Sequence, residues 1–279
     1  MSSIAPSPSS SDRPERFTGL DYREVVSGQW GPPDPLLHPD PFHPPRLYRI
    51  LIVLLRWLLP RLFRIEVDGR ENLPGPPFIL ASNHQRWFDP LFLLLAMPRL
   101  PMVYSMARRD TVFNRDWKRA IVRRAGVFAI QPFQGELDRM GVASVYHVLS
   151  RGGVVLIFPE GRYSRGRRLR PLKRGVAHFA LQAGVPVVPV ALEGVDRLRP
   201  FGHVRIAIGT PVWPDPPSWW DPSRRVVKLV DSVRRAMMTA FERRVPGRPG
   251  RLRRVGRRLR ERLLGWRRAK PPATGPPGR

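Results

Sequence analysis

His84 and Asp89 are the first side chains whose types and spacing point to catalysis: they lie in a predicted turn after the β-rich run Phe78–Ser82. Histidine takes up a proton near neutral pH, and a carboxylate bonded to one ring nitrogen leaves the other free to act as a base. Such a pair activates a hydroxyl nucleophile. A hydrogen-bonded loop histidine, and an aspartate that caps a helix beginning at Pro90, are the structural alternatives.

A second group of polar residues follows the β-rich run Val154–Phe158. Its members are a carboxylate, a glycine and two arginines: Glu160, Gly161, Arg162 and Arg165. A carboxylate at a strand end, beside a glycine that permits close approach, indicates a polar pocket for an anionic ligand, although a solvated surface turn explains the same residues. Lys173 and Arg174 add two cations at the head of a predicted helix, where a phosphate would also meet backbone N–H groups.

Strand-like and helix-like segments alternate through the middle of the chain. The predicted strands are Phe78–Ser82, Met102–Ser105, Val127–Ile130, Val154–Phe158, Val187–Leu192 and Val204–Ile208. Helices are predicted over Asp138–Ser150 and Gly175–Ala183, the second closed by Gly184. This alternation predicts an α/β fold with a mostly parallel central sheet flanked by helices. Active-site residues are then expected just after the strands, because ligands gather at their carboxyl ends.

Four motifs together carry a family resemblance. NHQRWFD, FPEGRYSR, PLKRG and VPVVPVAL, in this order over about residues 47–235, resemble the glycerolipid acyltransferase family, whose best-known members are 1-acylglycerol-3-phosphate acyltransferases. The resemblance implies transfer of a fatty acyl group from acyl-CoA or acyl carrier protein to a lipid hydroxyl, in phospholipid synthesis. It implies that His84 is the general base, that Asp89 orients it, and that the motif with Glu160 and Gly161 binds the acceptor.

The chain departs from the family pattern at two positions that bear on the acceptor. Where the family usually has a phosphate-binding arginine after the strand Val127–Ile130, this chain has Gln131, and where it usually has Thr-Arg after Glu-Gly, this chain has Arg162-Tyr163. Arg162 or Arg165 would replace the lost cation if the acceptor carries a phosphate. A neutral glycolipid or hydroxy lipid explains the same changes.

Three regions are predicted from composition. Residues 1–45 form an irregular arm rich in Pro and Ser, residues 46–240 the acyltransferase domain, and residues 241–279 a basic Arg/Pro-rich tail. Within the domain, residues 47–63 form an apolar segment that is too short and too rich in arginine to span a bilayer comfortably. It is predicted to be a membrane-associating helix, lying in the membrane plane or half-inserted; a buried helix of the domain is the alternative.

The charge balance narrows the choice of partner. The chain has 49 Lys and Arg against 22 Asp and Glu, a net charge of +27, and no Cys. The absence of Cys excludes thiolate metal sites and a cysteine nucleophile, and neither a metal nor a bound cofactor is expected. Anionic membrane lipids are the expected partner, at the cytoplasmic face of a membrane. A basic nucleic-acid-binding protein is the rival from another class; it is disfavoured because no recognisable binding motif accompanies the charge.

Overall fold

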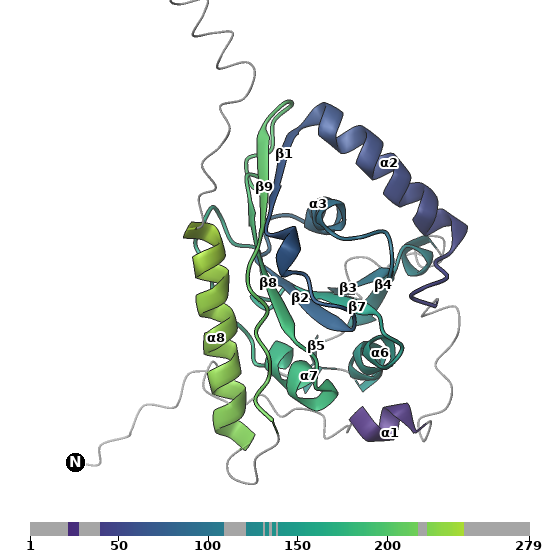
Figure 1. Ribbon diagram of the computed structural model, residues 1–279, viewed down its shortest axis with the longest axis vertical. Helices are drawn as coiled ribbons and strands as arrows, with labels where there is room; N and C mark the ends of the chain where they lie inside the picture. The colour runs from purple at the N-terminus through teal and green to yellow at the C-terminus, as the bar shows by residue number, and fades with distance from the viewer. Residues whose placement is uncertain are drawn as a thin grey trace, which may run out of the picture. The chain divides into compact units, whose positions relative to one another are not determined.

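The central element of the protein is a seven-stranded sheet with the strand order β1-β9-β8-β2-β7-β3-β4. The computed structural model describes residues 22–27, 40–108, 121–130, 132–133, 136–137, 139–216 and 222–242. All neighbouring strands of this sheet run parallel except β8 and β9, which are antiparallel. The predicted α/β fold with a mostly parallel sheet flanked by helices is therefore confirmed (Figure 1).

The strands lie close to their predicted positions. Those of the sheet are β1 (Arg64–Asp68), β2 (Phe78–Ser82), β3 (Val103–Arg108), β4 (Val127–Ile130), β7 (Val154–Ile157), β8 (Val187–Glu193) and β9 (His203–Ile208). A separate antiparallel pair consists of β5 (Pro132–Phe133) and β6 (Glu136–Leu137). The sequence patterns did not predict β1, β5 or β6.

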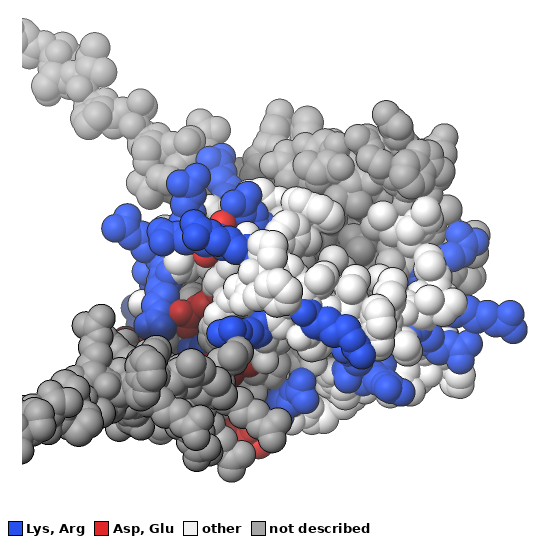
Figure 2. All heavy atoms as spheres, turned by 90° about the horizontal axis from the view of Figure 1, so that it is seen from above, with Lys and Arg blue, Asp and Glu red and all other residues white. Residues whose placement is uncertain are grey.

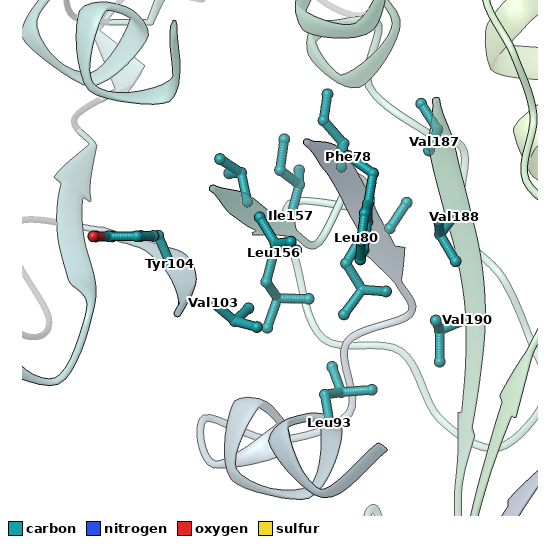
Figure 3. Close-up of a cluster of buried hydrophobic side chains, with 14 of the residues drawn as sticks. Phe78, Leu80, Leu93, Val103, Tyr104, Leu156, Ile157, Val187, Val188 and Val190 are labelled. Atoms are coloured by element: carbon teal, nitrogen blue, oxygen red, sulfur yellow. The ribbon is translucent and has the colours of Figure 1, made fainter. Parts of the chain in front are cut away.

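The central strands are apolar because both faces of the sheet are covered. Every residue of β2 and β7 is buried, as expected where helices pack on both sides of parallel strands. Leu80 of β2 lies between Leu156 of β7 and Val188 of β8 in the core, with Leu93 of the helix α3 (Asp89–Ala96) nearby (Figure 3). This packing holds the carboxyl ends of β2 and β7, two neighbouring parallel strands, at one edge of the sheet.

Helices cover the two faces of the sheet unequally (Figure 1). On one face lie α3 and α2 (Arg46–Leu62), which contact each other. On the other lie α6 (Arg139–Ser150), α7 (Gly175–Ala183) and α8 (Pro222–Glu242), which pack on β7, β2 and β8 respectively. The predicted helix 175–183 is confirmed, and Gly184 ends it in the left-handed conformation with φ 66°.

The apolar segment 47–63 forms the helix α2, and this part of the prediction is confirmed. Its inner side, with Tyr48, Ile52, Leu55 and Leu59, is buried in the domain. Its outer side carries six exposed apolar residues: Leu47, Ile50, Val53, Leu54, Trp57 and Leu62. No helix within the described residues is long and apolar enough to cross a membrane. The alternative prediction, a buried helix of the domain, thus holds for one side of the helix, and membrane association stays a prediction.

The terminal regions are described only in part. Of the predicted irregular arm, the structure describes residues 22–27 and 40–45, and the first of these stretches contains a short helix, α1 (Tyr22–Val26). The ring of Tyr22 packs edge-on against Tyr146 of α6, with ring centroids 5.4 Å apart. The predicted basic tail begins in the last turn of α8, and its residues from 243 onward lie outside the described part of the chain.

Candidate active site

His84 and Asp89 form a hydrogen-bonded pair where β2 leads into α3. The Nδ1 atom of His84 lies 2.7 Å from Oδ2 of Asp89. Because a carboxylate oxygen accepts hydrogen bonds, Nδ1 carries the proton and Nε2 keeps its lone pair. Nε2 makes no hydrogen bond to any residue in the described part of the chain. The structure thus brings the predicted base and its orienting carboxylate together.

The carboxylate of Asp89 also closes the turn that carries the histidine. Its Oδ2 accepts the backbone N–H of Gln85 at 2.5 Å and of Arg86 at 2.9 Å. Asp89 is fully buried, and a buried carboxylate is costly unless donors surround it. The helix begins at Asp89 itself, after Phe88 as N-cap residue. The aspartate therefore binds residues upstream of the helix instead of capping it.

Two aromatic rings hold the imidazole. The ring of Phe158 stacks on His84 with centroids 3.9 Å apart, and Tyr163 contacts it edge-on at 4.5 Å. The side chain of His84 remains 19% exposed. Since Nδ1 is bonded and the ring plane is covered, the exposed part can present Nε2 to a substrate.

Glu160 braces the loop after β7 against the loop after β2. Its Oε1 accepts the backbone N–H of His84 and the hydroxyl of Ser164, each at 3.0 Å, and its Oε2 accepts the N–H of Arg170 at 2.7 Å. Burial raises the pKa of Glu160, and these hydrogen bonds act in the opposite direction. The carboxylate is thus occupied by protein donors. Its predicted contact with an acceptor stays a prediction.

The predicted cations lie around this loop. Arg162, Arg165, Lys173 and Arg174 are exposed, and their side chains make no ion pair with any described residue. Lys173 packs over Gly161: a Cβ atom added there would lie 2.7 Å from Cε of Lys173. The flexible Lys173 side chain could move aside, but Gly161 has φ 66°, in the left-handed region that favours glycine. Gln131, the other predicted acceptor residue, lies outside the described residues.

Comparison with known proteins finds a family match for the central part of the chain. Residues 64–193, which run from β1 to the end of β8 and include the whole His84–Glu160 arrangement, match the family described as Acyltransferase. The resemblance predicted from the four motifs is confirmed.

Individual relatives of this acyltransferase domain agree with the family match. A chloroplastic 1-acyl-sn-glycerol-3-phosphate acyltransferase of Brassica napus is 27% identical, over 54% of this chain and 46% of its own length. The human 1-acyl-sn-glycerol-3-phosphate acyltransferase alpha is 26% identical, over 70% of this chain and 69% of its own. A lyso-ornithine lipid O-acyltransferase of Pseudomonas aeruginosa is 33% identical, over 53% and 58%. The chain thus spans about half to two thirds of the length of these relatives.

A solved structure shares the fold of the acyltransferase domain. It is the 1-acyl-sn-glycerophosphate acyltransferase of Thermotoga maritima, with a TM-score of 0.52 and 22% identity, covering 70% of this chain and 77% of that one. At this identity the likeness bears on the arrangement of helices and strands. It agrees with the mostly parallel sheet described above.

Sequence reasoning missed two amides that hold the turn carrying His84. Asn83 exchanges two hydrogen bonds with the backbone of Leu192 at the end of β8, at 2.7 and 2.9 Å. The Oε1 atom of Gln85 accepts the N–H of Val195 at 3.0 Å, and its Nε2 donates to the carbonyl of Gly166 at 3.1 Å. Both side chains are buried. Polar residues on each side of His84, directly after a buried strand, were the available signal.

The described residues contain no group of three or more His, Asp or Glu side chains placed to hold a metal ion. The expectation that the reaction needs neither a metal nor a bound cofactor stays a prediction.

Replacing Glu160 by Gln should destabilise the domain. The substitution puts an amide NH₂ where a carboxylate oxygen now accepts a hydrogen bond, so one donor faces another. We expect the free energy of unfolding in urea to fall by about 1–3 kcal/mol. Glu71→Gln, an exposed carboxylate in the 3₁₀ turn Arg70–Asn72, is the matched control and should change it by less than about 0.5 kcal/mol. Equal stability of the two variants would contradict the bracing role.

Proposed function

We propose that this protein is an O-acyltransferase that moves a fatty acyl group from an acyl thioester to a lipid hydroxyl. The observation that carries the proposal is the His84–Asp89 pair, in which Nδ1 is bonded to a buried carboxylate and Nε2 is left for a substrate. The match of residues 64–193 to the Acyltransferase family supports it. The names of the relatives point to a lipid as the acceptor.

The proposed reaction proceeds by direct attack. Nε2 of His84 takes the proton of the acceptor hydroxyl while its oxygen bonds to the thioester carbonyl carbon. The tetrahedral intermediate then breaks the carbon–sulfur bond, and the leaving thiolate takes the proton back from the imidazolium. Asp89 stabilises the imidazolium and holds its tautomer. No acyl-enzyme is required, which agrees with a chain that has no Cys, and the only co-substrate is acyl-CoA or acyl carrier protein.

His84→Ala should abolish acyl transfer and leave the fold intact, because the side chain supplies the base and contributes little to the core. General base catalysis contributes about 10²- to 10⁴-fold, so the rate should fall at least a hundredfold. The measurement is transfer of a labelled acyl group from acyl-CoA to 1-acylglycerol-3-phosphate, with circular dichroism to check folding. His43→Ala, a largely exposed histidine, is the control. A folded His84→Ala protein that retains a tenth of the wild-type rate would refute the assignment.

We infer that the acceptor is 1-acylglycerol-3-phosphate. Two observations support it: the names of the plant and human relatives, and the exposed Arg162 and Arg165 beside the catalytic loop. Two observations favour the alternative, an acceptor without this phosphate. Tyr163, where the family usually has the arginine of Thr-Arg, packs against His84, and one relative is a lyso-ornithine lipid O-acyltransferase.

Arg162→Ala and Arg165→Ala should discriminate between these acceptors. A charge-assisted contact is worth about 1.5–3 kcal/mol, so loss of a phosphate contact should raise KM for 1-acylglycerol-3-phosphate about 10- to 150-fold. Arg139→Ala, an exposed arginine at the start of α6, serves as control. If the protein acylates a lyso-ornithine lipid or glycolipid but not 1-acylglycerol-3-phosphate, the acyltransferase assignment stands and the phosphate-bearing acceptor is wrong.

We further propose that α2 lies on the membrane that supplies the acceptor, peripherally or half-inserted. Ile50 and Trp57 on its outer side are 64% and 55% exposed. The surface continues to the turn between β8 and β9, where exposed Phe201 donates its N–H to the carbonyl of Leu62 at 2.7 Å. Seen from the side on which α2 lies, uncharged surface is flanked by Lys and Arg (Figure 2). An apolar strip edged by cations suits an anionic bilayer, and the cytoplasmic leaflet carries such a surface charge.

Replacing Ile50 and Trp57 together by Ser should weaken membrane binding that resists salt. At a lower limit of about 1.5 kcal/mol for each buried apolar side chain, partitioning should fall roughly a hundredfold. Flotation with vesicles of phosphatidylglycerol and phosphatidylcholine, in low and high salt, measures it. Met140→Ser with Met238→Ser, exposed residues of α6 and α8, is the matched control. Equal loss in both double variants would show that α2 has no special part in binding.

A further inference from the structure

A basic groove of about 710 Å³ runs along α8 next to the start of α7. Five cations line it, Arg174, Arg224, Lys228, Arg234 and Arg235, against the single carboxylate of Asp231. Volumes of this size are typical of small-molecule sites. Such an excess of one sign within a concave surface attracts a ligand with several negative charges.

Bonds to the protein neutralise only part of this charge. Lys228 pairs with Asp215 at 2.8 Å. Arg234 donates to the carbonyl of Arg170 at 3.2 Å, and Arg235 to the hydroxyl of Ser232 at 3.2 Å. The last two bonds are to uncharged oxygen atoms, so these guanidinium groups keep their positive charge in the groove. Guanidinium groups suit phosphate oxygens, which they bind through paired N–H donors.

The groove is joined to the catalytic loop by backbone contacts. Arg170, whose carbonyl accepts the bond from Arg234, donates its own N–H to Oε2 of Glu160. Arg174 directly follows Lys173, whose N–H bonds to the carbonyl of Pro159 at 2.8 Å. The segment between Pro159 and Arg174 therefore forms part of the groove at one end and packs on His84 at the other.

The groove lies on the side of the sheet away from α2. Helix α8 packs on β8 from the face opposite to α2 and α3 (Figure 1). If α2 rests on the membrane, the groove is turned toward water. A dissolved polyanion is then a better fit than the headgroup of a lipid in that membrane.

We propose that this groove binds the phosphates of the acyl donor's carrier, a nucleotide-type polyphosphate joined to the acyl thioester by a flexible pantetheine arm; this rests on the proposed function. The arm would lead from the groove along residues 159–174 to His84. Val227, the apolar residue that lines the groove, offers a surface to the nucleobase. A small molecule is favoured over an acidic carrier protein because specific protein complexes bury about 800 Å² on each partner, far more surface than one groove supplies.

The first test measures binding without catalysis. Adenosine 3′,5′-bisphosphate, the nucleotide part of coenzyme A, is titrated into the full chain in a calorimeter. Arg174→Glu combined with Arg235→Glu removes two cations that make no ion pair with a described residue and should weaken binding by at least about a hundredfold, at roughly tenfold or more for each contact. Arg139→Glu is the control: it reverses the charge at an exposed position on α6, outside the groove, and should change the affinity by no more than about twofold.

The second test compares two donors that differ only in the nucleotide. The double variant should raise KM for acyl-CoA by a similar factor and leave KM for the matching acyl-pantetheine unchanged, because the shorter donor does not reach the groove. Its kcat with acyl-CoA should stay near that of the wild type, since the chemistry at His84 is untouched. Equal effects on both donors would overturn the proposal.

The outcomes separate this proposal from the proposed function. In one outcome the wild type transfers acyl groups, and neither the double variant nor Arg139→Glu changes nucleotide binding. The groove proposal would then be wrong, and the proposed acyltransferase function would stand. In another outcome the double variant loses nucleotide binding, and the wild type transfers no acyl group from any thioester. The groove would then stand as a nucleotide site, and the proposed reaction would be refuted. If the double variant is impaired only in binding vesicles of phosphatidate, or only in using acyl carrier protein, the groove binds that ligand and the nucleotide proposal is wrong.

Discussion

The buried carboxylate of Asp89 is the group on which the catalytic turn depends. One oxygen atom, Oδ2, accepts hydrogen bonds from the ring of His84 and from the backbone of Gln85 and Arg86. A negative charge in a fully buried position is costly, and these three donors together with the start of α3 offset part of that cost, since Oδ1 has no hydrogen-bond partner among the described residues. The same bonds fix the histidine tautomer. The hydrogen bonds that close the turn are therefore also those that leave Nε2 of His84 unprotonated.

A second buried carboxylate makes the arrangement rigid from the other side. Glu160 holds the backbone N–H of His84 while Asp89 holds its ring. The two carboxylates follow β2 and β7, which are neighbours in the sheet, so the parallel register of these strands sets the distance between them. Catalysis by positioning requires this rigidity, since a loosely held base loses much of its effect. In the proposed reaction, the core of the domain would thus position the base through the sheet register.

The sequence predicted the centre of this structure better than its edges. The bounds of β2 and β4 follow from runs of apolar and β-branched residues. The edge strand β1 was missed because Arg64, Glu66 and Asp68 alternate with its apolar residues. The helix α8 was missed because its arginines lower the mean hydropathy of a segment whose buried side alone is apolar.

The site was predictable in its residue types but only partly in its contacts. His84 and Asp89 are five residues apart, so their pairing is a local matter that spacing can suggest. Glu160 meets the backbone of His84 across 76 residues, and Asn83 meets Leu192 across 109. Such contacts exist only once the strand order is set. For this reason the sequence did not predict that the Glu160 carboxylate bonds to protein groups, and its contact with an acceptor stays a prediction.

The two faces of the sheet carry different surfaces, and each suits one of the two proposed substrates. The exposed side of α2 carries six apolar residues together with Arg46, Arg49 and Arg61, and the groove along α8, on the opposite face of the sheet, is cationic. The His84 turn lies at the strand ends, which both faces share. A lipid acceptor delivered at α2 and a phosphorylated donor held at α8 would then approach this turn from different sides, without competing for one entrance. In the proposed reaction the acyl chain passes from a water-soluble donor to a lipid, and a base at the sheet edge would keep each substrate's polar part in a compatible environment during transfer.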